Sequence, residues 1–139
     1  MKPTYSTLMQ SKFFNPAFNS AIFDGPIRIY FSQAHESQAL KIYFCLQQKY
    51  LDLVNVAKEI HKKDGRNLLV MLYPDQEAFS MSFEEKNEFL AFEKLAEDSV
   101  LGISGPFEDE KLAIVLEEIV KDLRSWDLAV LAHPAELTL

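Results

Sequence analysis

The sequence predicts an α/β domain with a mixed, mainly parallel sheet, an N-terminal hairpin and three helices. Short apolar runs of strand character, at residues 27–31, 68–72 and 100–103, alternate with longer segments of helical periodicity. Strands that alternate with helices form parallel sheets through right-handed crossovers. The 139 residues, 48% of them hydrophobic, fit one such domain, placed at residues 25–139 behind an apolar arm at residues 1–24.

The arm is apolar but shows no regular period. It contains four phenylalanines and an isoleucine, Phe13, Phe14, Phe18, Ile22 and Phe23. Leaving such side chains in water would cost about 1.5–3 kcal/mol each. We therefore expect the arm to pack against the body of the domain.

The first part of the body alternates apolar and polar residues. Residues 27–31 show this period of two, and residues 40–46 repeat it with Leu, Ile, Phe and Leu. We interpret residues 27–46 as an antiparallel hairpin with a long polar loop. The alternative is one helix over residues 36–63, since many of the same side chains also fit helical spacing. Its length and the polar break at residues 47–49 favour the hairpin.

The middle of the chain gives stronger signals. Residues 50–62 have the spacing of an amphipathic helix, which Asp64-Gly65 would end. The unbroken apolar run Leu68–Leu72 is typical of a central strand covered on both faces.

The C-terminal part is expected to hold two more helices. Ser82-Phe83-Glu84-Glu85 has the pattern of a capping box, which would open a helix ending near Asp98. The inward side chains of that helix would be Phe89, Phe92 and Leu95. Residues 100–103 form a short strand, residues 108–125 a third helix, and residues 128–131 a last edge strand.

Charge is distributed unevenly within the formal net charge of −7. Residues 1–74 carry a net charge of +4, and residues 75–139 carry −11. Because the C-terminal half is so acidic, it would repel the phosphate backbone of a nucleic acid, and we do not expect a nucleic acid as a partner. It would instead attract a basic protein surface. The sequence contains no run of about 18 apolar residues, so we expect no membrane-spanning segment. The single Cys suits a reducing compartment, and we expect a cytoplasmic protein.

The groups needed for common catalytic and cofactor sites are missing from the pattern. His35, His61 and His133 lack the spacing that places two imidazoles on one helix face for a metal. No His lies near Cys45 in the sequence, and no glycine-rich phosphate loop is present. The sequence therefore predicts no catalytic residue, no metal site and no cofactor, and we expect a protein that is not an enzyme.

The predicted element order resembles that of STAS domains, the anti-sigma-factor-antagonist type. The resemblance covers about residues 26–137 and places the stretch Ala78–Phe83 where that family carries its switch serine. Met81 stands near the serine position, Ser80 stands near the preceding acidic position, and Ser82 is the nearest hydroxyl. The resemblance implies a regulatory domain that binds a partner protein.

Our leading hypothesis is thus a non-enzymatic interaction domain with an acidic contact surface. The residues proposed to form it are Ser80, Ser82, Glu84 and Glu88. A phosphoryl group on either serine would add about two negative charges at the predicted helix start and could switch partner binding. The apolar arm and an edge strand would also suit a homodimer.

The alternative is a sensor domain with a flavodoxin-like, three-layer α/β fold that binds a small molecule or a divalent cation. Acidic residues follow two of the predicted strands, and the carboxyl ends of parallel strands meet at one edge of a sheet. Carboxylate oxygens also suit hard cations. The pocket would involve Asp75, Glu77, Ser104 and Asp109, with Glu108 and Glu110 nearby.

Overall fold

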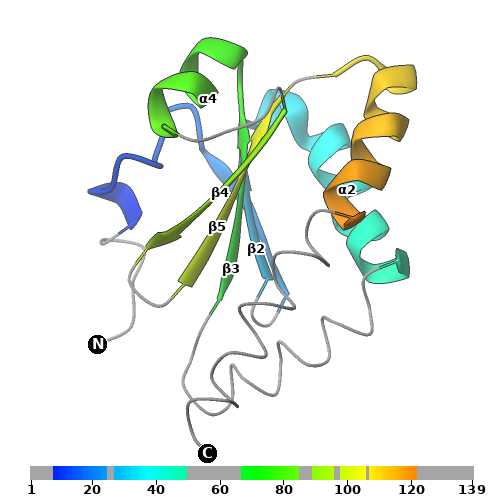
Figure 1. Cartoon of the computed structure of the whole chain (residues 1–139), viewed down its shortest axis with the longest axis horizontal. Coiled ribbons are helices and arrows are strands. Elements are labelled where there is room, and N and C mark those ends of the chain that lie inside the picture. The colour runs from blue at the N-terminus through cyan, green and yellow to red at the C-terminus, as the bar shows by residue number, and fades with distance from the viewer. Residues whose placement is uncertain are drawn as a thin grey trace, which may run out of the picture.

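The computed structural model describes residues 8–24, 27–49, 67–84, 89–95, 98–105 and 107–121. They form a mixed five-stranded sheet in the order β1-β2-β3-β5-β4, with helices on both faces (Figure 1). The general prediction of an α/β fold with a mixed sheet is confirmed. No helix among these residues is long and apolar enough to cross a membrane.

The N-terminal hairpin joins β1 (Ser20–Asp24) to β2 (Ile27–Phe31). The two strands are antiparallel, with Ser20 opposite Phe31 and Asp24 opposite Ile27. The end of the arm is therefore a strand of the sheet. It had been expected to be irregular.

The predicted hairpin over residues 27–46 is wrong, because its second half lies in helix α2 (Glu36–Lys49), which follows the short 3-10 turn η1 (Gln33–His35). Ala39, Ile42 and Leu46 are buried along one side of this helix. The alternating residues Leu40 and Phe44, in contrast, are 37% and 53% exposed. The alternative helix is thus confirmed as far as Lys49. Its continuation and the helix expected at residues 50–62 lie outside the described residues.

The centre of the sheet is parallel, as predicted. β3 (Leu68–Tyr73) lies between β2 and β5 (Asp98–Ser104) and runs parallel to both. Every residue of β3 and β5 is buried. Such continuous burial explains why these two strands could be recognised from their sequence.

The segment between β3 and β5 differs from the prediction. Helix α4 (Gln76–Ser82) begins after Asp75, whose carboxylate accepts a hydrogen bond from the Ala78 N–H. Ser82 is therefore the last residue of a helix, and the helix expected from Ser82 to Asp98 is wrong. Its expected inward residues Phe92 and Leu95 lie in β4 (Leu90–Leu95), which pairs antiparallel with β5. Successive residues of β4 lie on opposite faces of the sheet, so Leu90 belongs to one hydrophobic core and Ala91 to the other.

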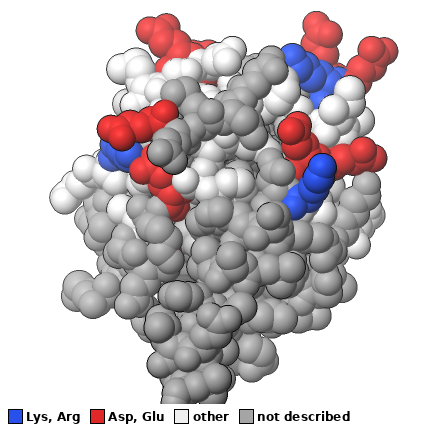
Figure 2. Space-filling view, in the orientation of Figure 1, with Lys and Arg blue, Asp and Glu red and all other residues white. Residues whose placement is uncertain are grey.

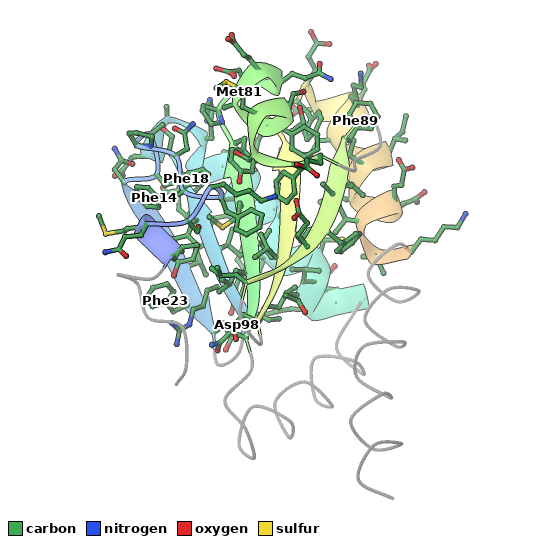
Figure 3. The ribbon with its side chains drawn as sticks, turned by 60° about the vertical axis from the view of Figure 1, so that its left-hand side comes forward. Phe14, Phe18, Phe23, Met81, Phe89 and Asp98 are labelled. Atoms are coloured by element: carbon green, nitrogen blue, oxygen red, sulfur yellow. The ribbon has the colours of Figure 1, made fainter. Side chains whose placement is uncertain are left out.

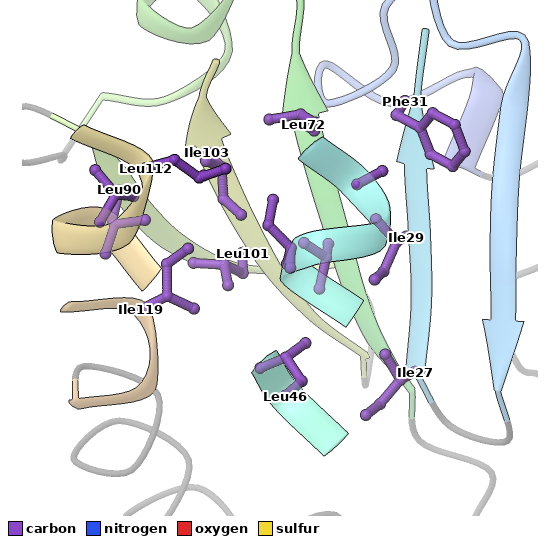
Figure 4. Close-up of a cluster of buried hydrophobic side chains, with 14 of the residues drawn as sticks. Ile27, Ile29, Phe31, Leu46, Leu72, Leu90, Leu101, Ile103, Leu112 and Ile119 are labelled. Carbon is purple, nitrogen blue, oxygen red and sulfur yellow. The ribbon is translucent and has the colours of Figure 1, made fainter. Parts of the chain in front are cut away.

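The two faces of the sheet have separate hydrophobic cores. The first lies beneath α2 and the helix of residues 109–121, which run side by side (Figures 1 and 4). This helix confirms the predicted third helix as far as residue 121. The rest of it, and the strand expected at residues 128–131, are outside the described part of the chain.

The second core lies beneath the N-terminal arm and α4. Phe13 and Phe18 of the arm are 2% and 5% exposed, and Phe79 of α4 is fully buried with them. The Tyr73 hydroxyl donates a hydrogen bond to the Phe13 carbonyl at 2.6 Å. The expectation that the arm packs on the domain is therefore confirmed for these residues.

Candidate functional site

A crevice forms where β3 and β5 end. These neighbouring strands are parallel, and Tyr73 is opposite Ser104 at their carboxyl ends. The chain leaves β3 toward α4, whose Phe79 belongs to the second core, and leaves β5 toward the helix of residues 109–121, which packs on the first core. Two adjacent parallel strands that continue to opposite faces leave a crevice between them, and open α/β sheets bind ligands at such places.

A pocket of about 540 Å³ occupies this crevice. Two lining residues lie at the start of α4 and one directly precedes β4, while the others run from the last residue of β5 to the first turn of the helix of residues 109–121. The lining residues are Asp75, Gln76, Phe89, Ser104, Gly105, Phe107, Glu108 and Lys111.

Two aromatic rings form the apolar wall of the pocket. Phe89 and Phe107 meet edge to face, with their ring centroids 5.6 Å apart and their planes at 80°. The Lys111 ammonium lies 4.6 Å from the centroid of the Phe89 ring, a typical cation–π distance. Phe89 thus stands between β4 and the helix that carries Lys111 (Figure 3).

The segment after β5 is held in place by α2. The Gln38 side chain accepts a hydrogen bond from the Phe107 N–H at 2.9 Å and donates one to the Phe107 carbonyl. Gly105 approaches the core so closely that a Cβ there would lie 2.5 Å from Leu72 Cδ1. The Ser104 N–H donates to the Phe89 carbonyl at 2.9 Å, which ties the two sides of the pocket together. The pocket is therefore largely preformed.

The structure brings some of the predicted pocket residues together and separates others. Asp75 and Ser104 both line the pocket, together with Glu108. Glu77 instead lines a second pocket, of about 360 Å³, between α4 and the arm. Asp109 is mostly exposed and lies outside both pockets, with its Oδ1 atom 3.3 Å from Lys41 Nζ.

The sequence interpretation missed five lining residues, Gln76, Phe89, Gly105, Phe107 and Lys111. Phe89 had been assigned to the interior of a helix, so its position before an edge strand was not foreseen. Phe107 gave one usable signal, because it follows a Gly-Pro turn directly after a buried strand.

The proposed switch surface is less compact than expected. Ser80 is exposed on α4, whereas Ser82 is 8% exposed and donates a hydrogen bond to the Ala78 carbonyl at 3.0 Å. Glu84 is exposed, and Glu88 lies outside the described residues. Both serines are in the last turn of α4, so a phosphoryl group there would face the negative end of a helix, not the positive end.

No set of three or more His, Cys, Asp or Glu residues in the described ranges is arranged to hold a metal ion. Comparisons with protein-family models, curated proteins and solved structures found no match to this chain.

Proposed function

We propose that this chain is a small-molecule-binding domain whose ligand occupies the pocket at the carboxyl ends of β3 and β5. The observation that carries the proposal is the position of the pocket, between neighbouring strands whose continuations go to opposite faces of the sheet. The proposal assigns binding to this site and no chemical step.

The size of the pocket and its pair of aromatic rings suit a small-molecule ligand. Its volume lies within the range of about 300–1,000 Å³ that is usual for ligand pockets. The aromatic rings of Phe89 and Phe107 line the pocket together with polar groups of Asp75 and Ser104. Apolar surface supplies affinity, and a few fixed polar groups orient the ligand.

A fragment screen followed by NMR tests this proposal. Compounds that bind are expected to shift the amide signals of Ser104, Gly105 and Phe107. The variant Gln76→Trp places a large ring at the exposed rim of the pocket and should abolish these shifts. Ser80→Trp is the matched control, because Ser80 is exposed on the same helix but does not line the pocket.

Two results would contradict the proposal. One is a screen in which no compound perturbs the pocket signals. The other is binding that Gln76→Trp and Ser80→Trp weaken equally, since the ligand would then lie elsewhere.

A second candidate function is contact with a partner protein through α4. Met81 is 80% exposed, and the exposed carboxylates of Glu77 and Glu84 lie close to it in the sequence (Figure 3). An apolar side chain flanked by acids suits a partner that offers an apolar contact and basic side chains. The resemblance to STAS domains, which was inferred from the predicted element order, also favours a partner contact near the helix that follows the central strand, and that helix is α4.

Pull-down with a Met81→Asp, Glu84→Lys double variant tests the second candidate. A specific partner should be lost from this variant and retained by Gln76→Trp. If the wild type and both variants bind the same partners, α4 is not the contact surface.

A further inference from the structure

We infer that the pocket at the carboxyl ends of β3 and β5 selects an organic cation, an amine attached to an aromatic or aliphatic group. The inference rests on the proposed function and adds the chemical class of the ligand. Three features of the lining support it: the placement of the carboxylates, the contact between Lys111 and Phe89, and the aromatic wall.

The carboxylates approach the pocket from opposite sides. Asp75 directly precedes α4 on one face of the sheet, and Glu108 directly precedes the helix of residues 109–121 on the other face. Lys111 is the one basic residue in the lining, so the lining has a net negative charge. On the face drawn in Figure 2, acidic side chains are also spread over the end of the molecule that carries α4. An anionic ligand would be repelled here, and an ammonium group would be attracted.

The contact between Lys111 and Phe89 shows what one wall of the pocket accepts. The Lys111 ammonium lies over the ring of Phe89, at 4.6 Å from its centroid. The Lys111 side chain is exposed, and within the described ranges of the chain it forms no ion pair, so its contact with this ring is not shared with a carboxylate there. A ligand ammonium could take the same place between the ring and the carboxylates when the lysine turns toward solvent. In the absence of a ligand, the Lys111 ammonium would thus occupy the position that the ammonium group of the ligand takes.

The aromatic wall accounts for the other end of the ligand. Phe107 is 9% exposed, and its backbone is fixed by two hydrogen bonds with the Gln38 side chain, one accepted and one donated by Gln38. Its ring and the ring of Phe89 form an apolar surface that lines the pocket together with the charged groups. A molecule with an apolar body and one ammonium group matches both parts of this lining.

Three probe compounds of similar size test the inference directly. They are phenethylamine, which is cationic at neutral pH, 2-phenylethanol, which is neutral, and 3-phenylpropionate, which is anionic. We expect NMR titration to show the amine binding about tenfold more tightly than the alcohol, because two carboxylates and one ammonium group line the pocket. The propionate should bind more weakly than either.

Isosteric variants locate the charges responsible. Asp75→Asn and Glu108→Gln should each weaken amine binding by about two- to fivefold, and leave alcohol binding unchanged. Asn is as good an N-cap as Asp, so Asp75→Asn retains the start of α4. Lys111→Gln should strengthen amine binding, because it removes the competing cation. Asp109→Asn is the matched control, since it makes the same charge change one residue from Glu108 but outside the pocket.

The outcomes separate this inference from the proposed function. If the alcohol or the propionate binds in the pocket as tightly as the amine, the charge selection is wrong and the pocket still binds small molecules. If Asp109→Asn weakens the amine as much as Glu108→Gln, the effect comes from overall charge and the inference fails. If neither these probes nor any compound of the fragment screen perturbs the pocket signals, both the inference and the proposed function fail.

Discussion

The hydroxyl of Tyr73 joins the N-terminal arm to the central strand. Its hydrogen bond to the Phe13 carbonyl is 2.6 Å long, and the ring packs against Phe18, Phe79 and Phe83. Burial raises the pKa of Tyr73 well above its ordinary value, and the charge of Glu93 adds to the shift. The hydroxyl therefore keeps its proton in the folded protein at pH values where the unfolded chain would release it.

This environment predicts how Tyr73→Phe changes stability. The lost hydrogen bond should lower the free energy of unfolding by about 1 kcal/mol at neutral pH. Because the raised pKa belongs to the folded state, the stability from the protonated phenol is present below about pH 10 and declines above it. Urea denaturation from neutral to alkaline pH should thus show a shallower alkaline loss in Tyr73→Phe than in the wild type. Equal alkaline slopes would contradict the assignment. Tyr43→Phe should change the alkaline slope less, because Tyr43 is less buried, and burial together with the hydrogen bond from its hydroxyl to Asp24 raises its pKa by less than that of Tyr73.

At the scale of elements, α2 allows a direct test of helix against strand. A strand over residues 40–46 would place Ile42 and Phe44 on the same face, whereas the helix buries Ile42 completely and leaves Phe44 53% exposed. Ile42→Ala should therefore cost about 2–5 kcal/mol of unfolding free energy. Phe44→Ala should cost about 1 kcal/mol or less. Chemical denaturation of the two variants measures both values, and similar large losses would favour the strand.

Two segments, α2 and β4, show where sequence patterns stop being informative. Residues 40–46 alternate like a strand yet form a helix, and Phe89, Phe92 and Leu95 have helical spacing although Phe92 and Leu95 lie in a strand. A short apolar pattern fits either period, and the choice depends on partners elsewhere in the chain. β4 is a strand because it forms backbone hydrogen bonds with β5. α2 is a helix because this conformation places Ala39, Ile42 and Leu46 together on the first core. Neither partner is visible from the segment itself.

Some residues of the candidate site could be predicted from the sequence, and others could not. Asp75 and Ser104 could be predicted, because Asp75 follows β3 and Ser104 ends β5, and both strands are buried on both faces and therefore recognisable. The aromatic wall could not, because the contact between Phe89 and Phe107 depends on the pairing of β4 with β5. The contact between Lys111 and Phe89 depends further on how the following helix returns across the sheet. The polar residues Asp75 and Ser104 can thus be found from local sequence patterns, whereas the apolar wall of Phe89 and Phe107 depends on the assembled fold.

At the scale of the whole molecule, the sheet needs a cover on both faces. α2 and the helix of residues 109–121 cover one face, while α4 and the arm cover the other (Figure 1). α4 has only seven residues, so much of the second cover comes from Leu8, Phe13 and Phe18 of the arm. The arm also supplies β1, which pairs with β2 along its whole length.

This arrangement predicts that a fragment of residues 25–139 will not unfold cooperatively. Removing the arm exposes the buried rings of Tyr30, Tyr73 and Phe79 and leaves β2 as an unpaired edge. Near-UV circular dichroism and urea denaturation should show lost side-chain packing in the fragment. Phe13→Ala in the full chain gives a graded version and should cost about 3–5 kcal/mol. Phe23→Ala is the control within the same arm, because Phe23 is 63% exposed, and its contact with the Tyr30 ring is worth about 1 kcal/mol. A fragment with the cooperative transition of the full chain would show that the second core does not need the arm.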